Sequence, residues 1–232
     1  FATGGVVVAL VGPQATGKST ISKNLLRWLG CEFPVRVTHA GKPPSSLFTS
    51  IPNLVMPLAR IILPRHRSSH IETSDDRKAN YSLIHLLRVV CLAYDRKIML
   101  LRMHKLASRG QIVVTDRYPS KVEGAIDSPH FNQNEIKMQS SCTKRFLMRL
   151  EARIYENIPS PDLVIRLNVP VDVAVQRDLK RDKPGKKDSN YVRRRHSMTI
   201  KPEFVCTVED VSTLDDYSKT EMTIRSLVWA AI

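Results

Sequence analysis

A glycine-rich turn near the start of the chain carries the clearest chemical signal. Its residues, Gly12-Pro13-Gln14-Ala15-Thr16-Gly17-Lys18-Ser19, fit the pattern GxxxxGK[ST] in full, and Thr20 follows directly. The glycines let the backbone curl so that several N–H groups point at one phosphate, and the helix that starts here adds its positive end. Lys18 can reach the β- and γ-phosphates of a nucleoside triphosphate as a catalytic group, and the Ser19 hydroxyl can bind Mg²⁺. We therefore predict that residues 12–20 hold ATP with Mg²⁺; the structural alternative is a turn with an exposed lysine.

A second polar group follows a β-branched run later in the chain. Residues 111–115 (QIVVT) predict a strand, and Asp116, Arg117 and Tyr118 come directly after it. Ligands collect at the carboxyl edge of open parallel sheets, so these side chains should lie beside the phosphate loop. A carboxylate there can hold Mg²⁺ through water, and an arginine can neutralise a phosphate in transfer. Asp116 is thus a candidate metal ligand and catalytic residue, and Arg117 a candidate catalytic residue; the alternative is a turn cap beside a surface charge.

Apolar runs and helical periodicity alternate along the rest of the chain. Strands are expected at 6–11, 35–38, 111–115, 162–169 and 204–208, and helices at 21–29, 80–108, 135–157, 171–180 and 213–231. This alternation predicts an α/β fold whose mostly parallel sheet is covered by helices on both faces. The apolar residues that recur at helical spacing in 80–108 are Leu83, Leu86, Leu87, Val90, Tyr94, Ile98, Leu101 and Leu106, and the core candidates of 135–157 are Ile136, Phe146, Leu147, Leu150 and Ile154.

Basic residues crowd the region between the fourth and fifth strands. They are Arg177, Arg181, Lys183, Lys186, Lys187, Arg193, Arg194 and Arg195. We predict a small basic lid at residues 178–192 that closes over the phosphates and excludes water. Arg177 and Arg181 share one face of the helix that enters this lid, so they are the first candidates for catalytic arginines. A solvated basic loop or a nucleic-acid patch is the alternative.

Length, charge and cysteine usage set broad limits. The 232 residues suit a single domain spanning 1–232, and a formal charge of +14 attracts anions. The four cysteines lack CxxC or zinc-like spacing, so we expect free, buried thiols in a reducing cytoplasm. Because no apolar stretch is long enough to span a bilayer, no membrane partner is expected.

In combination and in order along nearly the whole chain, these motifs resemble the thymidylate kinases, a family of P-loop nucleoside monophosphate kinases. The matching pieces are the phosphate loop, Asp116-Arg117-Tyr118, the helical pair Asp95-Arg96, and the run from Pro161 through Arg177. The resemblance implies a P-loop kinase fold with a five-stranded parallel sheet, and ATP as the donor. It also implies that Arg96 binds the acceptor's phosphate, that Arg117 bridges donor and acceptor phosphates, and that Asp116 serves the Mg²⁺ site. Relatives of this type often form dimers, so a homodimer is one partner to test for.

The acceptor side departs from the family. Gln14 stands where the family carries an acidic residue, and Leu92 where it carries a base-stacking phenylalanine. An arginine-bearing loop is replaced by residues 38–45, where His39 and Lys42 could supply positive charge. Asp127 could contact an acceptor hydroxyl or cap the turn before Pro129. The predicted substrate-binding residues are Arg96, His39, Lys42, Tyr118 and Leu92.

Three functions follow from these residues. The first is a nucleoside monophosphate kinase that takes a small anionic substrate, a nucleotide. The second is a kinase of a hydroxyl group on a nucleoside, sugar or other metabolite, with Asp116 or Asp127 near the hydroxyl. The third is a nucleotide-binding switch or nucleic-acid-binding ATPase, which the basic charge suggests. Against nucleic acid, the chain has only 6% aromatic residues and no basic strand interleaved with aromatic residues.

Overall fold

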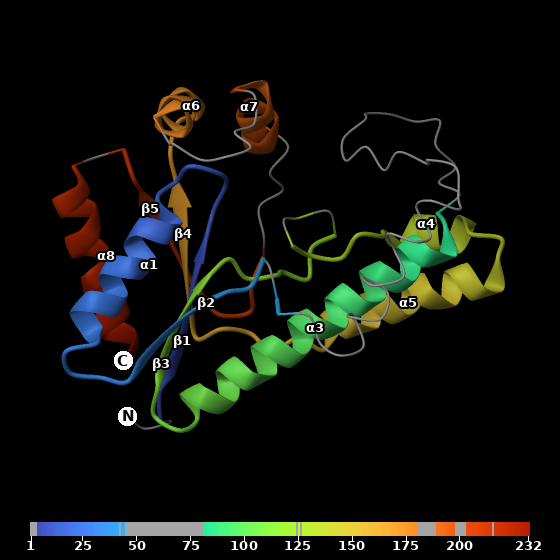
Figure 1. Cartoon of the computed structure of the whole chain (residues 1–232), viewed down its shortest axis with the longest axis horizontal. Helices are drawn as coiled ribbons and strands as arrows, with labels where there is room; N and C mark the ends of the chain where they lie inside the picture. The colour runs from blue at the N-terminus through green and yellow to red at the C-terminus, as the bar shows by residue number, and fades with distance from the viewer. Residues whose placement is uncertain are drawn as a thin grey trace.

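The apolar run before the phosphate loop forms the central strand of a five-stranded sheet, and every strand pair is parallel (Figure 1). The strand order is β2-β3-β1-β4-β5. The strands are β1 (Val6–Val11), β2 (Val35–His39), β3 (Ile112–Asp116), β4 (Leu163–Asn168) and β5 (Thr207–Ser212). The expected α/β fold with a parallel sheet is therefore confirmed.

This computed structural model describes residues 4–41, 43–44, 81–123, 125, 127–180, 189–197, 203–214 and 216–232. Lys42, Arg181 and most of the segment 41–67 lie outside these ranges, as do residues 181–188 of the expected lid. All structural statements below concern the described residues.

Side chains of β1 alternate between two apolar clusters, because successive residues of a strand point to opposite faces. Val7, Ala9 and Val11 pack with helices α3 (Leu83–Ala107) and α5 (Cys142–Glu156). Val6, Val8 and Leu10 pack with α1 (Lys18–Leu29) and α8 (Tyr217–Ala231) on the other face. Helices therefore cover both faces of the sheet, as Figure 1 shows. Since all six residues of β1 are buried, the sequence there is a continuous apolar run.

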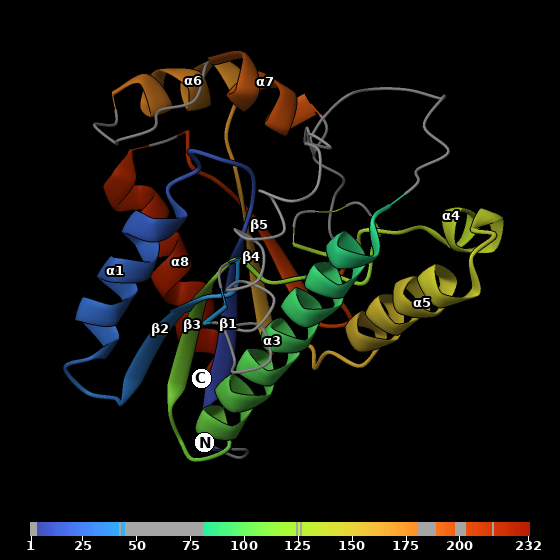
Figure 2. The same cartoon turned by 45° about the vertical axis from the view of Figure 1, so that its right-hand side comes forward.

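The carboxyl ends of the parallel strands meet at one edge of the sheet. The phosphate loop follows β1 there, and β3 ends there at Asp116. Two short helices, α6 (Val171–Leu179) and α7 (Ser189–Ser197), lie beyond the same edge (Figure 2). Helix α7 was not expected from the sequence, because its basic residues read as a loop.

The expected helix 135–157 is wrong as one element, because it is two helices. Helix α4 (Gln133–Met138) begins with a capping box between Asn132 and Glu135, and α5 begins after Ser141. Serine favours helix caps over helix interiors, which explains the break. Phe146 is exposed, whereas its neighbours Leu147 and Met148 are buried.

The fifth strand is displaced from its expected range, 204–208, to Thr207–Ser212. It pairs with β4 from Leu163↔Thr207 to Asn168↔Ser212. Phe204 and Cys206 are partly buried and pack against the cluster that contains α3, although they precede the strand. Their apolar character therefore placed the expected start of the strand too early.

The buried face of α3 agrees with the expected one only in part. Leu86 is buried and Val90 and Leu106 pack partly buried against a core cluster, but Leu83, Leu87, Tyr94 and Leu101 are exposed. The helix buries the following residues: Leu86, Val89, Ala93, Asp95, Arg96, Met99, Leu100, Met103 and Ala107. Apolar residues occur around most of this helix, so periodicity alone did not separate its two faces.

The exposure of the cysteines differs from the burial expected from the sequence. All four cysteines are free, as expected, but Cys31 and Cys142 are exposed and Cys91 and Cys206 only partly buried. Within the described ranges, no helix combines the length and apolar character that a membrane span requires.

Candidate functional site

The phosphate loop joins β1 to α1 and adopts backbone conformations that favour glycine. Gly12 has φ 142°, and a Cβ there would lie 2.4 Å from the Leu167 carbonyl oxygen. Gly17 has φ 90° and forms the N-cap of α1, with its carbonyl accepting from the backbone N–H of Ile21. The loop therefore curls tightly beside β4 and places the amino end of α1 at the edge of the sheet, which is an anion-binding arrangement.

The Lys18 ammonium lies inside this curl. It donates to the Gly12 carbonyl at 3.0 Å, to the Pro13 carbonyl at 2.6 Å and to Thr16 Oγ1 at 3.1 Å. The side chain is buried, and Thr16 is fully buried beneath it. The positive charge is thereby held against the phosphate loop by two of its carbonyls and one hydroxyl.

Ser19 and Asp116 meet across the sheet edge. Ser19 Oγ donates to Asp116 Oδ2 at 2.8 Å, while Asp116 Oδ1 is buried and has no hydrogen-bond partner among the described residues. A buried carboxylate oxygen without a partner is costly, and a cation would satisfy it. Mg²⁺ is commonly held by one or two protein oxygens together with substrate phosphates. The donor set of Ser19 and Asp116 therefore fits the predicted Mg²⁺ site.

His39, at the end of β2, adjoins the same carboxylate. Its Nδ1 lies 3.0 Å from the Asp116 backbone oxygen and 3.8 Å from Asp116 Oδ2. Since β2 and β3 pair with His39 opposite Asp116, the sheet register fixes this contact. The structure thus places His39 next to the predicted metal ligand, with its side chain 41% exposed.

Two arginines converge on one carboxylate beside this edge. Arg96 Nη2 lies 2.8 Å from Asp127 Oδ1, and Arg117 Nη1 lies 3.1 Å from Asp127 Oδ2. We call Arg96, Asp127 and Arg117 the arginine–aspartate cluster. The Arg96 side chain is 4% exposed and that of Arg117 36% exposed. Arg117 is therefore the more accessible of the two predicted phosphate-binding arginines.

Arg96 makes further contacts that hold it in place. Its guanidinium also donates to the Ala40 carbonyl at 3.3 Å, to the Asp127 carbonyl at 3.1 Å and to the Tyr155 hydroxyl at 2.6 Å. These partners come from the end of β2, the segment after β3 and α5. Arg96 thus connects three parts of the fold. Its contacts are those of a positioning residue, and the predicted contact with an acceptor's phosphate stays a prediction.

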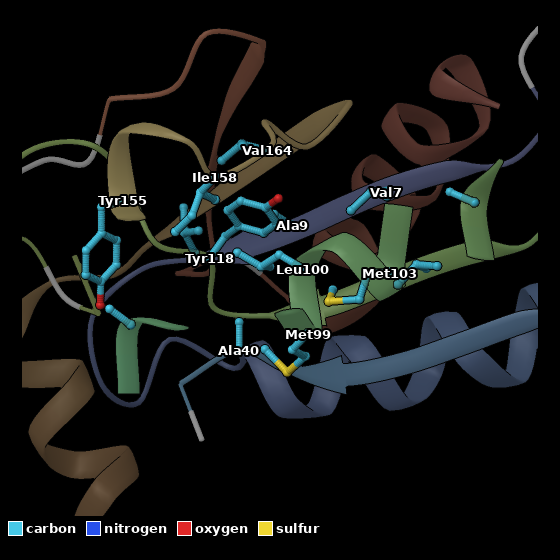
Figure 3. Close-up of a cluster of buried hydrophobic side chains, with 14 of the residues drawn as sticks. Val7, Ala9, Ala40, Met99, Leu100, Met103, Tyr118, Tyr155, Ile158 and Val164 are labelled. Carbon is cyan, nitrogen blue, oxygen red and sulfur yellow. The ribbon is translucent and has the colours of Figure 1, made fainter. Parts of the chain in front are cut away.

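Tyr118 does not face this site. Figure 3 shows its ring in the core with Ala9, Leu100 and Ile158. Its hydroxyl donates to the Pro159 carbonyl at 2.7 Å and lies 3.1 Å from His104 Nε2. Burial raises the pKa of the Tyr118 hydroxyl well above its usual range. The prediction that Tyr118 binds substrate does not agree with this position, because the ring fills the core beneath the sheet edge.

The structure describes two of the four remaining predicted residues, Arg177 and Leu92. Arg177 donates to Thr213 Oγ1 at 3.0 Å and to the Thr213 carbonyl, so it ties α6 to the end of β5. A catalytic role would require Arg177 to leave these partners. Leu92 lies half-buried on α3. Arg181 and Lys42 lie outside the described residues.

Helices α6 and α7 contact the phosphate loop directly. Gln14 Nε2 donates to Asp178 Oδ1 at 3.2 Å, and His196 Nε2 lies 2.9 Å from the Gln14 carbonyl. Ala15 belongs to a small apolar cluster with Val192 of α7. Gln14, which replaces the family's acidic residue, is therefore directed toward α6. The contacts made by Asp178 and His196 were missed, because neither residue belongs to a local motif.

A parallel sheet of order β2-β3-β1-β4-β5, with a phosphate loop between β1 and α1, defines this chain as a P-loop protein. No protein-family model matches it. The chain is 25% identical over 176 residues to Uncharacterized ATP-binding protein YghR of Escherichia coli K12, covering 74% of this chain and 68% of that protein. It is 24% identical over 182 residues to Uncharacterized ATP-binding protein YghS of the same strain, covering 74% and 72%. A solved structure described as "Crystal structure of APE1195" superposes with a TM-score of 0.40 at 19% identity, covering 99% of this chain and 98% of that one.

Proposed function

We propose that this protein is an ATP- and Mg²⁺-dependent phosphotransferase of the P-loop kinase type. The observation that carries the proposal is the 2.8 Å hydrogen bond from Ser19 to Asp116, together with the buried Asp116 Oδ1, which has no partner in the part of the chain that the structure describes. These two residues are the metal ligands that the phosphate loop and the third strand predict. The ATP-binding names of YghR and YghS support ATP as the donor nucleotide.

The position of each site residue determines its role in phosphoryl transfer. Ser19 and Asp116 would hold Mg²⁺, which when bound neutralises charge on the phosphate oxygens. Lys18 exchanges its three loop acceptors for donor phosphate oxygens, and the amino end of α1 adds its partial positive charge. Arg117, at the same edge, stabilises charge on the phosphoryl group as it moves. The chemistry needs positioning and electrostatic stabilisation more than covalent participation by the protein.

Helices α6 and α7 form the described part of the proposed lid. The contacts of Gln14 with Asp178 and His196 bring them over the phosphate loop. We assign residues 1–232 to one catalytic domain and extend the lid from the expected 178–192 to the end of α7, Ser197. Closure there would exclude water, which otherwise competes as acceptor.

Two acceptor classes are compatible with this chemistry. The resemblance to thymidylate kinases favours a nucleoside monophosphate, and the partly exposed Arg117 supports it by offering a cation near the donor phosphates. An uncharged hydroxyl acceptor is favoured by a different observation. The Asp127 carboxylate already bridges the two arginines that a phosphate would use.

An ADP-release assay with ATP and Mg²⁺ tests the proposal. The acceptors are nucleoside monophosphates, nucleosides, and sugars with their phosphates. We expect acceptor-dependent release by the wild type and none by Lys18→Ala, whereas Lys23→Ala on the same helix should behave as the wild type. ATP binding without transfer to any acceptor would instead assign the chain to nucleotide-binding switches or ATPases.

A further inference from the structure

We propose that Asp127 is a specificity-determining residue that fills the anion position between Arg96 and Arg117, so that the acceptor is an uncharged hydroxyl compound rather than a phosphomonoester. This inference rests on the proposed phosphotransferase function and names its substrate class. The residue acts by exclusion: its own carboxylate occupies the place that an acceptor phosphate would need.

The geometry is that of an occupied two-arginine site. Asp127 presents one oxygen to each guanidinium, at 2.8 Å to Arg96 and 3.1 Å to Arg117. Arginines that bind a phosphate group use the same kind of charge-assisted contacts. The Asp127 side chain is only 12% exposed, so it is a built-in partner rather than a surface ion pair.

Neighbouring backbone shapes the site around this carboxylate. A Cβ on Gly41 would lie 2.7 Å from Arg117 Cδ and 3.2 Å from Asp127 Oδ2, so the segment after β2 closes against the pair. Asp127 and Arg117 both have positive φ, at 62° and 74°. Positive φ is uncommon for non-glycine residues, although aspartate adopts it more readily than most. Asp127 and Arg117 therefore approach each other from uncommon backbone conformations.

Charge makes this arrangement selective. An acceptor phosphate that approached Arg117 would meet the Asp127 carboxylate, whose like charge repels it and which already neutralises the Arg117 guanidinium. Arg96 cannot readily turn to a ligand, because Ala40, Tyr155 and the Asp127 backbone also accept from it. A neutral hydroxyl meets no such repulsion and can accept or donate at the exposed part of the cluster.

The transfer step balances for this acceptor. The hydroxyl oxygen forms a bond to the γ-phosphorus of ATP, and the bond from that phosphorus to the bridging oxygen breaks. ADP leaves with the electron pair of that bond, and the hydroxyl proton is released to solvent. The products are a phosphomonoester and ADP.

The first test uses the wild-type chain and matched acceptors. Each uncharged compound, such as a nucleoside or hexose, is compared with its own 5′- or 6-phosphate in the ADP-release assay. We expect the best uncharged acceptor to exceed the best phosphorylated one by at least tenfold in kcat/KM. A preference for the phosphorylated members would overturn the inference.

The second test measures inorganic phosphate binding to the full chain by calorimetry. Asp127→Asn keeps the size of the side chain and tolerates positive φ, but it removes the charge. We expect phosphate to bind Asp127→Asn at least tenfold more tightly than the wild type, and the gain to disappear in Asp127→Asn/Arg117→Gln. The matched control is Asp210→Asn, whose carboxylate also accepts from two side chains, Arg166 and Asn168, but lies on β5. Equal phosphate affinity in the wild type and Asp127→Asn would refute exclusion by Asp127.

ADP binding, measured in the same variants, distinguishes failure of the proposed phosphotransferase function from failure of phosphate exclusion by Asp127. Unchanged ADP affinity across the variants shows that the phosphate loop is intact. Failure of the wild type to bind ADP would reject the proposed function, while the phosphate comparison would still decide whether Asp127 blocks the two-arginine site. If Asp127→Asn does not fold, the acceptor ranking of the wild type decides alone.

Discussion

The hydroxyl of Ser19 donates a 2.8 Å hydrogen bond to the carboxylate of Asp116, although 97 positions separate the two residues in the sequence. Ser19 lies in the first turn of α1, directly after the phosphate loop, and Asp116 is the last residue of β3. Strand β1 pairs with β3 in the register Leu10↔Asp116, which brings the strand end beside the loop. The predicted metal site therefore depends on sheet register as much as on the loop itself.

Ser19→Ala should lower kcat/KM on the order of a hundredfold, because groups that stabilise transferring charge typically contribute that much. Steady-state ADP release over a range of Mg²⁺ concentrations measures the effect and should show a raised Mg²⁺ requirement. Ser22→Ala is the matched control, since Ser22 is buried on the same helix and donates to the Ser19 carbonyl. A Ser19→Ala enzyme within fivefold of the wild type would remove Ser19 from the metal site.

Tyr118→Phe should destabilise the protein without changing its substrate affinity. The substitution removes the part-buried hydrogen bond to the Pro159 carbonyl, which should lower the free energy of unfolding by about 1 kcal/mol. Urea denaturation measures the stability, and the acceptor KM should stay within twofold. An increased KM at unchanged stability would instead restore the substrate-binding role predicted from the sequence.

Arg177→Ala should also act on stability, since Arg177 ties α6 to Thr213 after β5. Hydrogen bonds from a charged donor exceed neutral ones, but this side chain is partly exposed, so we expect a loss of about 1 kcal/mol. Thermal denaturation measures it, with Arg88→Ala on the exposed side of α3 as the control. A near-normal melting temperature with a hundredfold loss of turnover would show that Arg177 acts in catalysis, as predicted from the sequence.

Alkaline stability should depend on Tyr155. Burial raises the pKa of its hydroxyl from 10.0 to about 12, although the Arg96 charge opposes part of this rise. Because the folded pKa exceeds the unfolded one, the stabilisation is complete below pH 10 and is lost as pH rises toward 12. Chemical denaturation of Tyr155→Phe at pH 9 to 12 should show a shallower decline than the wild type, by roughly 2 kcal/mol at the upper end. The exposed Tyr94→Phe serves as the control, and parallel declines for all three proteins would contradict the assignment.

Local signals in the sequence predicted the parts of the molecule that depend on neighbouring residues. The run Val6–Val11 and the glycine spacing after it gave β1 and the phosphate loop, and Asp116 was placed correctly because a strand end and a carboxylate coincide there. The position of Asp127 between two arginines had no local signal, since Arg96 lies 31 positions away and reaches it only through the packing of α3. Apolar residues also lie on both faces of α3, so only tertiary contacts decide which of them are buried.

Helix α7, in the proposed lid, likewise depends on a tertiary contact that the local sequence does not reveal. Val192 is fully buried among Ala15 and Val175 in a stretch that otherwise reads as basic and exposed. One buried residue in nine does not produce a helical pattern. The burial of Val192 depends on its packing against Ala15 of the phosphate loop, which is distant in the sequence.

The central position of β1 has a consequence for synthesis of the chain. Its two neighbours in the sheet, β3 and β4, begin at Ile112 and Leu163, so β1 leaves the ribosome long before either partner exists. At about 5–20 residues per second, β4 follows β1 by roughly 8–30 s, during which a fully apolar strand has unpaired edges. Folding therefore has to await the carboxyl-terminal half, and a nascent or truncated chain that ends before β4 should bind chaperones or aggregate rather than fold.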